Sequence, residues 1–230
     1  MKTFVIGDIH GSYKALLQCL ERCGFDVDND RLIVLGDVCD GYPDVRSCID
    51  ALLKIRHCDL VIGNHDQWAL DWALRGDRPE VWNSQGGSRT IESYGGGLMP
   101  EEHVDFLQRG RLWIEFDQMV SVHGGFKPGI PFSEQTSEDL LWDRDLLSAA
   151  IKMHRKDPSH RFGDFDAIFL GHTTTQMYAS LEPIHACNVW AMDTGAGWSG
   201  KLTIMDVNTK KFWQSDLSSE LYGGIPGRME

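Results

Sequence analysis

The sequence has no long apolar run and no closely spaced cysteine pair. No apolar stretch reaches the roughly 18 residues that a membrane-spanning helix needs, and the N-terminus has no apolar segment of signal-peptide length. The six cysteines include no Cys-x-x-Cys pair and mostly fall among apolar residues. We therefore expect a cytoplasmic protein whose cysteines pack as small buried hydrophobic side chains.

Basic residues are also scarce. The chain has 22 Lys and Arg against 34 Asp and Glu, which gives a net charge of −12 and a pI near 5.1. Such a surface disfavours contact with a nucleic-acid backbone or an anionic membrane, so we expect neither partner. Any phosphate group must then be recognised locally, by metal ions or by a few arginines.

No change in composition and no Ser- or Pro-rich linker divides the chain. Its 230 residues suffice for one α/β domain with a large core. We predict a single domain over residues 1–230, with a cap-like insertion at about 75–116. The Gly- and Ser-rich segment at about 215–230 is expected to be a peripheral tail.

Apolar runs alternate with helix signals in the first half of the chain. Buried strands of a parallel sheet are predicted at 4–6, 32–35 and 60–62, and helices at 12–23, 44–57 and 66–74. The second half predicts one helix at 137–154 and strands at 119–122, 167–170, 188–192, 201–207 and 211–214. These later strands would form a second sheet stacked on the first.

Side chains that bind metals follow five of these strands. They occur in the blocks Gly-Asp-x-His-Gly (7–11), Gly-Asp-x-x-Asp (36–40) and Gly-Asn-His-Asp (63–66), and as His123 and His172. Each block alone is also typical of an ordinary turn or a packed histidine. Because the carboxyl ends of neighbouring strands form one crevice, the recurrence favours a shared metal site. Carboxylate, amide and imidazole ligands without thiolate suit ions such as Mn or Fe rather than a structural Zn.

The order of these blocks resembles the calcineurin-like metallophosphoesterases of the phosphoprotein phosphatase superfamily. Within them the chain is similar to the small bacterial and phage branch, which includes lambda-type serine/threonine phosphatases and symmetrical diadenosine tetraphosphatases. The resemblance runs from Phe4 to about Gly195 and includes residues 85–87, 141–144 and 192–195. It implies a four-layer αββα sandwich of two mixed sheets with a small cap insertion.

The resemblance also implies a centre of two divalent metal ions, most readily Mn, with Fe, Zn, Ni or Mg as alternatives. The implied ligands are Asp8 and His10 for one ion, Asn64, His123 and His172 for the other, and Asp37 as the bridge. Two such ions can convert a bound water to hydroxide and direct it at a phosphate ester. His65 would act as the general acid for the leaving oxygen, and Asp40 would orient its imidazole.

One residue departs from the family pattern. Asp40 is usually followed by an arginine that grips a phosphate oxygen, whereas this chain has Gly41. Arg144 matches a second family arginine and is the predicted substrate-binding residue, and Arg46 and Arg89 are further candidates for the missing contact. An arginine restored at position 41 is expected to tighten phosphate binding.

Three functions stay open. A phosphomonoesterase acting on phosphoserine or phosphothreonine proteins or on small phosphoesters is favoured, because the lambda-type resemblance covers most of the chain. A dinucleoside polyphosphate hydrolase is the alternative, since residues 85–94 also resemble the tetraphosphatases. A catalytically weak phosphate-binding protein is disfavoured because every metal ligand is present. Four aromatic residues would form either the core of the cap or a wall facing the substrate, and they are Trp68, Trp72, Trp82 and Tyr94.

Overall fold

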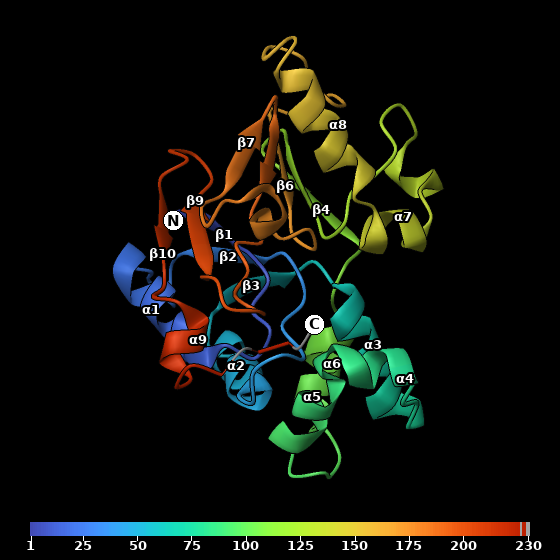
Figure 1. Cartoon of the computed structure of the whole chain (residues 1–230), viewed down its shortest axis with the longest axis vertical. Helices are drawn as coiled ribbons and strands as arrows, with labels where there is room; N and C mark the ends of the chain where they lie inside the picture. The colour runs from blue at the N-terminus through green and yellow to red at the C-terminus, as the bar shows by residue number, and fades with distance from the viewer. Residues whose placement is uncertain (226, 229–230) are drawn as a thin grey trace.

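The computed structural model describes residues 1–225 and 227–228, which form two five-stranded sheets packed face to face (Figure 1). The first sheet has the order β10-β9-β1-β2-β3, with strands Phe212–Gln214, Thr203–Asp206, Thr3–Ile6, Arg31–Val34 and His57–Leu60. The second has the order β4-β5-β6-β8-β7, with strands Trp113–Phe116, Met119–Val122, Ala167–Leu170, Val189–Ala191 and Ile184–Ala186.

Both sheets are mixed, with three parallel strands in each. β1 to β3 pair in parallel, as do β5, β6 and β8, whereas β9, β10, β4 and β7 join antiparallel. The parallel strands of each sheet therefore deliver their following loops to one edge. The predicted α/β fold with two mixed sheets is confirmed.

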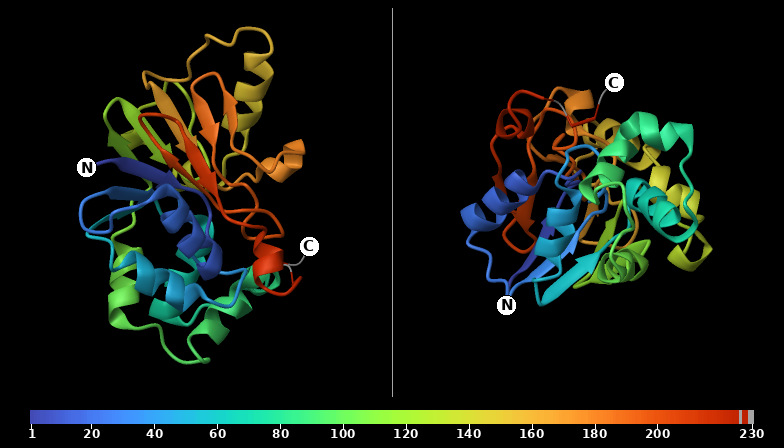
Figure 2. Two further views of the ribbon diagram at one scale, coloured as in Figure 1. Left: turned by 90° about the vertical axis from the view of Figure 1, so that its left-hand side faces the viewer. Right: turned by 90° about the horizontal axis from the view of Figure 1, so that it is seen from below.

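Strand side chains alternate between three core layers. In β1, Phe4 and Ile6 face the helices α1 (Tyr13–Cys23) and α2 (Val45–Leu52), whereas Val5 faces the second sheet. In β6, Phe169 joins the core between the sheets and Ile168 packs towards α8 (Asp145–His154). Helices thus cover both outer faces and give four layers (Figure 2). Full burial of each such side chain contributes about 1.5–3 kcal/mol.

A group of helices lies between β3 and β4 in the sequence. It packs beside the first sheet, at the lower right of Figure 1. Its elements are α3 (Asn64–Arg75), α4 (Glu80–Trp82), a π-helical turn (Asn83–Gly87), α5 (Ser88–Ser93) and α6 (Glu101–Gln108). The insertion predicted at 75–116 ends earlier than expected, because Trp113–Phe116 forms the edge strand β4. In the described residues no helix has both the length and the apolar character to cross a bilayer.

Two element predictions are wrong. The strand expected at 60–62 is β3 at His57–Leu60, an edge strand whose first residue is exposed, so it needs no continuous apolar run. The single helix expected at 137–154 is two helices, α7 (Ser137–Trp142) and α8. Asp143 interrupts them with an extended backbone, and its Oδ1 accepts a hydrogen bond from the Leu146 amide at the start of α8.

The segment expected to be a peripheral tail packs against the body of the protein. Ser218, in the short helix α9 (Ser218–Leu221), is fully buried. Tyr222 stacks on Tyr42 with ring centroids 4.4 Å apart, and its hydroxyl donates to Asp44 Oδ2 at 2.7 Å. The prediction of a peripheral segment is therefore wrong for Ser218 and Tyr222, whereas residues 223–225 are exposed.

Tyr222→Ala should lower the free energy of unfolding by about 1–3 kcal/mol, because it removes a stacked aromatic pair and a hydrogen bond to a carboxylate. Urea denaturation followed by fluorescence would measure the loss. Leu98→Ala is the matched control, since Leu98 is 88% exposed and its loss should change stability by less than about 0.5 kcal/mol. Equal stabilities of the two variants would show that the contact with Tyr42 contributes nothing.

Candidate active site

Four of the predicted site residues lie in turns with left-handed backbone conformation. His10, Asp37, Asp40 and His172 have φ values of 47°, 49°, 71° and 61°. Non-glycine residues seldom adopt this region, and its strain concentrates at functional sites, where the surrounding structure enforces it. The turns aim side chains from separate strand ends into one crevice.

Asp37 lies between two groups of histidines. The ligand atoms of His10, Asp37 and His65 all lie within 4.8 Å of one another, and so do those of Asp37, His123 and His172. All are buried apart from His172, which is partly exposed. Asp37 is the residue common to both groups, which is the geometry required of a bridging carboxylate.

Backbone carbonyls orient two of these imidazoles. His10 Nδ1 donates to the Cys39 carbonyl at 2.9 Å, and His123 Nδ1 donates to the Leu35 carbonyl at 2.7 Å. The second ring nitrogen, Nε2, is then free to offer its lone pair to a metal ion. His172 Nε2 is buried and has no hydrogen-bond partner among the described residues, as expected of a nitrogen whose partner is a metal.

Asn64 and Asp8 occupy different positions in the crevice. Asn64 Oδ1 lies 3.0 Å from His123 Nε2, and because both atoms carry lone pairs, a proton or a metal ion must lie between them. Asp8 is buried, but its carboxylate accepts the backbone N–H of His172 at 3.0 and 3.2 Å. The structure thus places Asp8 beside His172 and outside both histidine groups.

The electrostatics of the crevice favour a cation. Burial raises the pKa of Asp8 well above its usual range, and the neighbouring charge of Asp193 raises it further. Burial, with the charge of His123, lowers the pKa of His172 to about 3. Burial would also lower the pKa of His123, but the charge of Asp37 and its hydrogen bond to the ring outweigh the effect of burial and raise the pKa of His123 to about 10. A site of buried carboxyl groups and a neutral imidazole is a donor set that fits divalent metal ions.

His65 and Asp40 form a buried pair, and the cap helices hold the carboxylate. His65 Nδ1 lies 2.6 Å from Asp40 Oδ2, which also accepts from Trp82 Nε1 at 2.8 Å. The other carboxylate oxygen, Oδ1, accepts the Thr90 hydroxyl at 2.6 Å. The sequence had not indicated the roles of Trp82 and Thr90, because no local pattern relates them to a residue about fifty positions earlier.

Asp66 joins two of the strand-end blocks. Its carboxylate is fully buried and accepts the backbone N–H groups of Val38, Cys39 and Gly63 at 2.8, 3.0 and 3.1 Å. Gly63 must be glycine, because a Cβ there would overlap Asp37 Oδ1. These contacts fix the loops that carry Asp37 and the pair of Asp40 and His65.

The predicted arginines lie at the rim or on the surface. Arg144 is exposed at the start of α8, and its Nη1 lies 3.6 Å from the Met177 sulfur. Arg89 pairs with Glu92 on the surface, and the exposed Arg46 lies on α2. No hydrogen bond or ion pair in the described residues joins any of these three side chains to a predicted metal ligand.

Position 41 cannot accept an arginine without strain. Gly41 has a φ of +78°, and a Cβ there would lie 2.9 Å from His10 Cβ. Gly41→Arg would therefore strain the backbone and crowd His10, and its effect on phosphate binding stays a prediction.

The aromatic side chains divide between the cap core and the crevice. Three of the four expected as a wall are buried in the cap, and they are Trp72, Trp82 and Tyr94. The fourth, Trp68, has its ring 5.1 Å from that of His65 and 5.2 Å from that of Trp142. Trp142 is 40% exposed, with its ring 5.7 Å from His172. Trp68 and Trp142 thus line the rim, and the other three side chains form the core of the cap, which is one of the two predicted alternatives.

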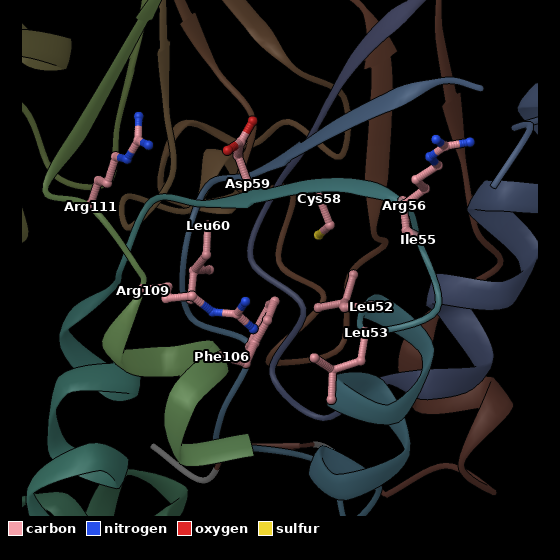
Figure 3. Close-up of a pocket in the computed structure, with 10 residues that line it drawn as sticks. All are labelled: Leu52, Leu53, Ile55, Arg56, Cys58, Asp59, Leu60, Phe106, Arg109 and Arg111. Atoms are coloured by element: carbon pink, nitrogen blue, oxygen red, sulfur yellow. The ribbon is translucent and has the colours of Figure 1, made fainter. Parts of the chain in front are cut away.

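A separate cavity of about 470 Å³ lies at the edge strand β3 (Figure 3). Its apolar lining includes Leu52, Leu60 and Phe106. Figure 3 shows Arg56 and Arg111 at opposite ends of β3, with both side chains pointing upwards and away from Leu52 and Phe106. Because the described lining of this cavity contains no histidine and a single carboxylate, the metal-type crevice is the better candidate for a functional site.

Comparison with known proteins agrees with this site. The chain is 29% identical to a serine/threonine-protein phosphatase 1 of Salmonella typhimurium, over 87% of this chain and 89% of that protein. It is 30% identical to a symmetrical bis(5'-nucleosyl)-tetraphosphatase of Nitrosomonas europaea, over 70% of this chain and 60% of that protein. The fold is similar to the crystal structure of a candidate diadenosine tetraphosphatase, with a TM-score of 0.69, 16% identity, and coverage of 98% of this chain and 93% of that one. The sequence model of the calcineurin-like phosphoesterases matches residues 1–176, and the chain belongs to that family.

Proposed function

We propose that this protein is a cytoplasmic phosphoesterase that uses two divalent metal ions to hydrolyse phosphate monoesters. The observation that carries the proposal is the position of Asp37, which is shared by two groups of histidines beside the buried pair of His65 and Asp40. Phosphoserine or phosphothreonine in a protein, or a small phosphoester, is the proposed substrate class. The phosphatase relative from Salmonella supports this choice because the match spans most of both chains.

The donor set supports two metal positions that share Asp37. Asp8 and His10 would hold one ion, with His10 offering Nε2, while Asn64, His123 and His172 would hold the other. When bound, the two ions would offset the charge of the phosphate and lower the pKa of a coordinated water. The oxygen- and imidazole-rich ligands favour manganese or iron.

His65 is the proposed general acid. Its Nδ1 donates to the Asp40 carboxylate, so a second proton on Nε2 requires the imidazolium form, and that proton would pass to the leaving alkoxide as the bond to phosphorus breaks. Asp40 accepts hydrogen bonds from Trp82 and Thr90, which hold the carboxylate in position against the ring. These two residues are therefore proposed as positioning residues.

A second candidate is hydrolysis of a dinucleoside polyphosphate. The exposed ring of Trp142 beside His172 offers a stacking face for a base at the edge of the crevice. Arg144, one residue from Asp143 at the same rim, could contact a more distant phosphate of a long substrate. The tetraphosphatase relatives support this alternative.

The metal assignment predicts different losses at two ligands. Asp37→Asn should lose both ions, because a neutral amide cannot offset two cations, whereas His10→Ala should keep one ion. Metal content per chain, measured by mass spectrometry after desalting, would separate the two results. Asp77→Asn, on the surface, is the control and should bind as many ions as the unchanged protein. Two ions retained by Asp37→Asn would exclude a shared carboxylate.

The acid role predicts a dependence on the leaving group. His65→Asn should lower the rate on the order of 10²–10⁴-fold for alkyl phosphates and much less for activated aryl phosphates, with unchanged metal content. Thr90→Val should lower the rate by a smaller factor, with the same dependence on the leaving group. Thr90→Ser, which keeps the hydroxyl, should retain the rate of the unchanged protein. Losses that are equal for good and poor leaving groups would show that His65 only positions the substrate.

A substrate panel tests the proposed function directly. Metal-stripped protein would receive Mn, Mg, Zn, Ni or Fe and then p-nitrophenyl phosphate, phosphopeptides or diadenosine tetraphosphate. We expect turnover of the monoesters, fastest with Mn. Turnover of the dinucleotide alone would support the second candidate, and no turnover with any metal would contradict both.

A further inference from the structure

We propose that Arg228, from the segment after α9, supplies the phosphate-binding guanidinium that Gly41 cannot provide. The inference deepens and rests on the proposed function, because it assigns a substrate contact to the same crevice. It assigns the contact to a residue near the far end of the sequence and beyond the part matched by the family. The ligand would be the phosphoryl group of the substrate or free inorganic phosphate.

The backbone around Arg228 is anchored against the crevice. The Arg228 amide donates to the Gly197 carbonyl at 2.8 Å, and the Gly227 amide donates to the Trp198 carbonyl at 3.1 Å. Gly197 lies directly on the His10 ring, where any Cβ would overlap the imidazole. The guanidinium also lies over the Trp198 ring, 4.6 Å from its centroid. The segment is therefore docked on residues that touch a predicted metal ligand.

The side chain of Arg228 passes beside the position that lacks an arginine. A Cβ at Gly86 would lie 2.7 Å from the Gly41 nitrogen and 3.6 Å from Arg228 Cγ. Gly86 is therefore in contact range of both the Gly41 backbone and the stem of the Arg228 side chain. The absence of a side chain at position 86 leaves room for Arg228 beside Gly41.

The guanidinium ends at a predicted metal ligand with donors to spare. Arg228 Nη2 donates to Gln85 Oε1 at 2.7 Å, while Nη1 lies 3.4 Å from His10 Nε2. Arg228 forms no ion pair within the described residues, and its buried Nε has no partner there. Because His10 Nδ1 is already a donor, Nε2 has one lone pair, and a metal ion would take it from Nη1. The released N–H groups then need an acceptor, which a phosphate oxygen supplies.

Phosphate binding to the metal-loaded protein tests this assignment. Inorganic phosphate would be titrated by calorimetry into the unchanged protein and into Arg228→Ala, with metal content checked for each. We expect Arg228→Ala to weaken binding about 10- to 100-fold, the scale of one charge-assisted hydrogen-bonded contact. Arg228→Lys should recover only part of the affinity, because a single ammonium cannot reproduce the planar fork.

Two controls separate the outcomes. Arg155→Ala removes the same charge from an exposed site after α8 and should leave phosphate affinity unchanged. Ile225→Ala alters the same segment at a side chain that is 58% exposed, and it should also be silent. An unchanged phosphate affinity in Arg228→Ala would overturn the assignment. If Mn binding became tighter at the same time, Arg228 would be identified as a competitor of the metal for His10. Binding is read without turnover, so failure of the substrate panel alone would count against the proposed function and not against this contact.

Discussion

The crevice depends on burying one carboxylate, Asp37, among histidines from different strand ends. Burial alone would raise the pKa of Asp37, but the charges of His123 and His65 hold it well below its usual range. A buried carboxylate is tolerated only where cations or donors surround it, and the His65 amide adds a hydrogen bond to Oδ1 at 3.0 Å. The strained turns and the close approach of Gly63 follow from this requirement, because they bring the surrounding groups within reach.

A second layer of contacts extends this arrangement beyond the two sheets. Asp66 links two strand-end loops through backbone N–H groups, while Trp82 and Thr90 reach Asp40 from the cap. The helices α4 and α5 therefore support the Asp40 carboxylate without supplying a predicted metal ligand. Such contacts help to keep a buried polar site ordered, since only four buried side-chain nitrogen and oxygen atoms in the described residues lack a hydrogen-bond partner.

The features that sequence could predict are local ones. A strand followed by Gly-Asp or Gly-Asn is a short-range pattern, so the positions of Asp37 and Asn64 at strand ends could be inferred. The break at Asp143 could not, because it depends on the loop after β5, where a Cβ at Gly124 would lie 2.8 Å from the Asp143 nitrogen. The contacts of Thr90 and Arg228 could not be predicted either, because the partner of each residue lies far away along the chain.

The pairing of β1 with β9 has a consequence for how the protein is made. Phe4 pairs with Asp206, so one edge of the first strand stays open on the ribosome until the hairpin of β9 and β10 has emerged. During that interval the apolar β1 exposes unpaired backbone groups, which invite pairing with other nascent chains. Long-range pairing of this kind also slows folding. Chaperones that cover the first strand during synthesis should therefore reduce wrong pairing of this chain.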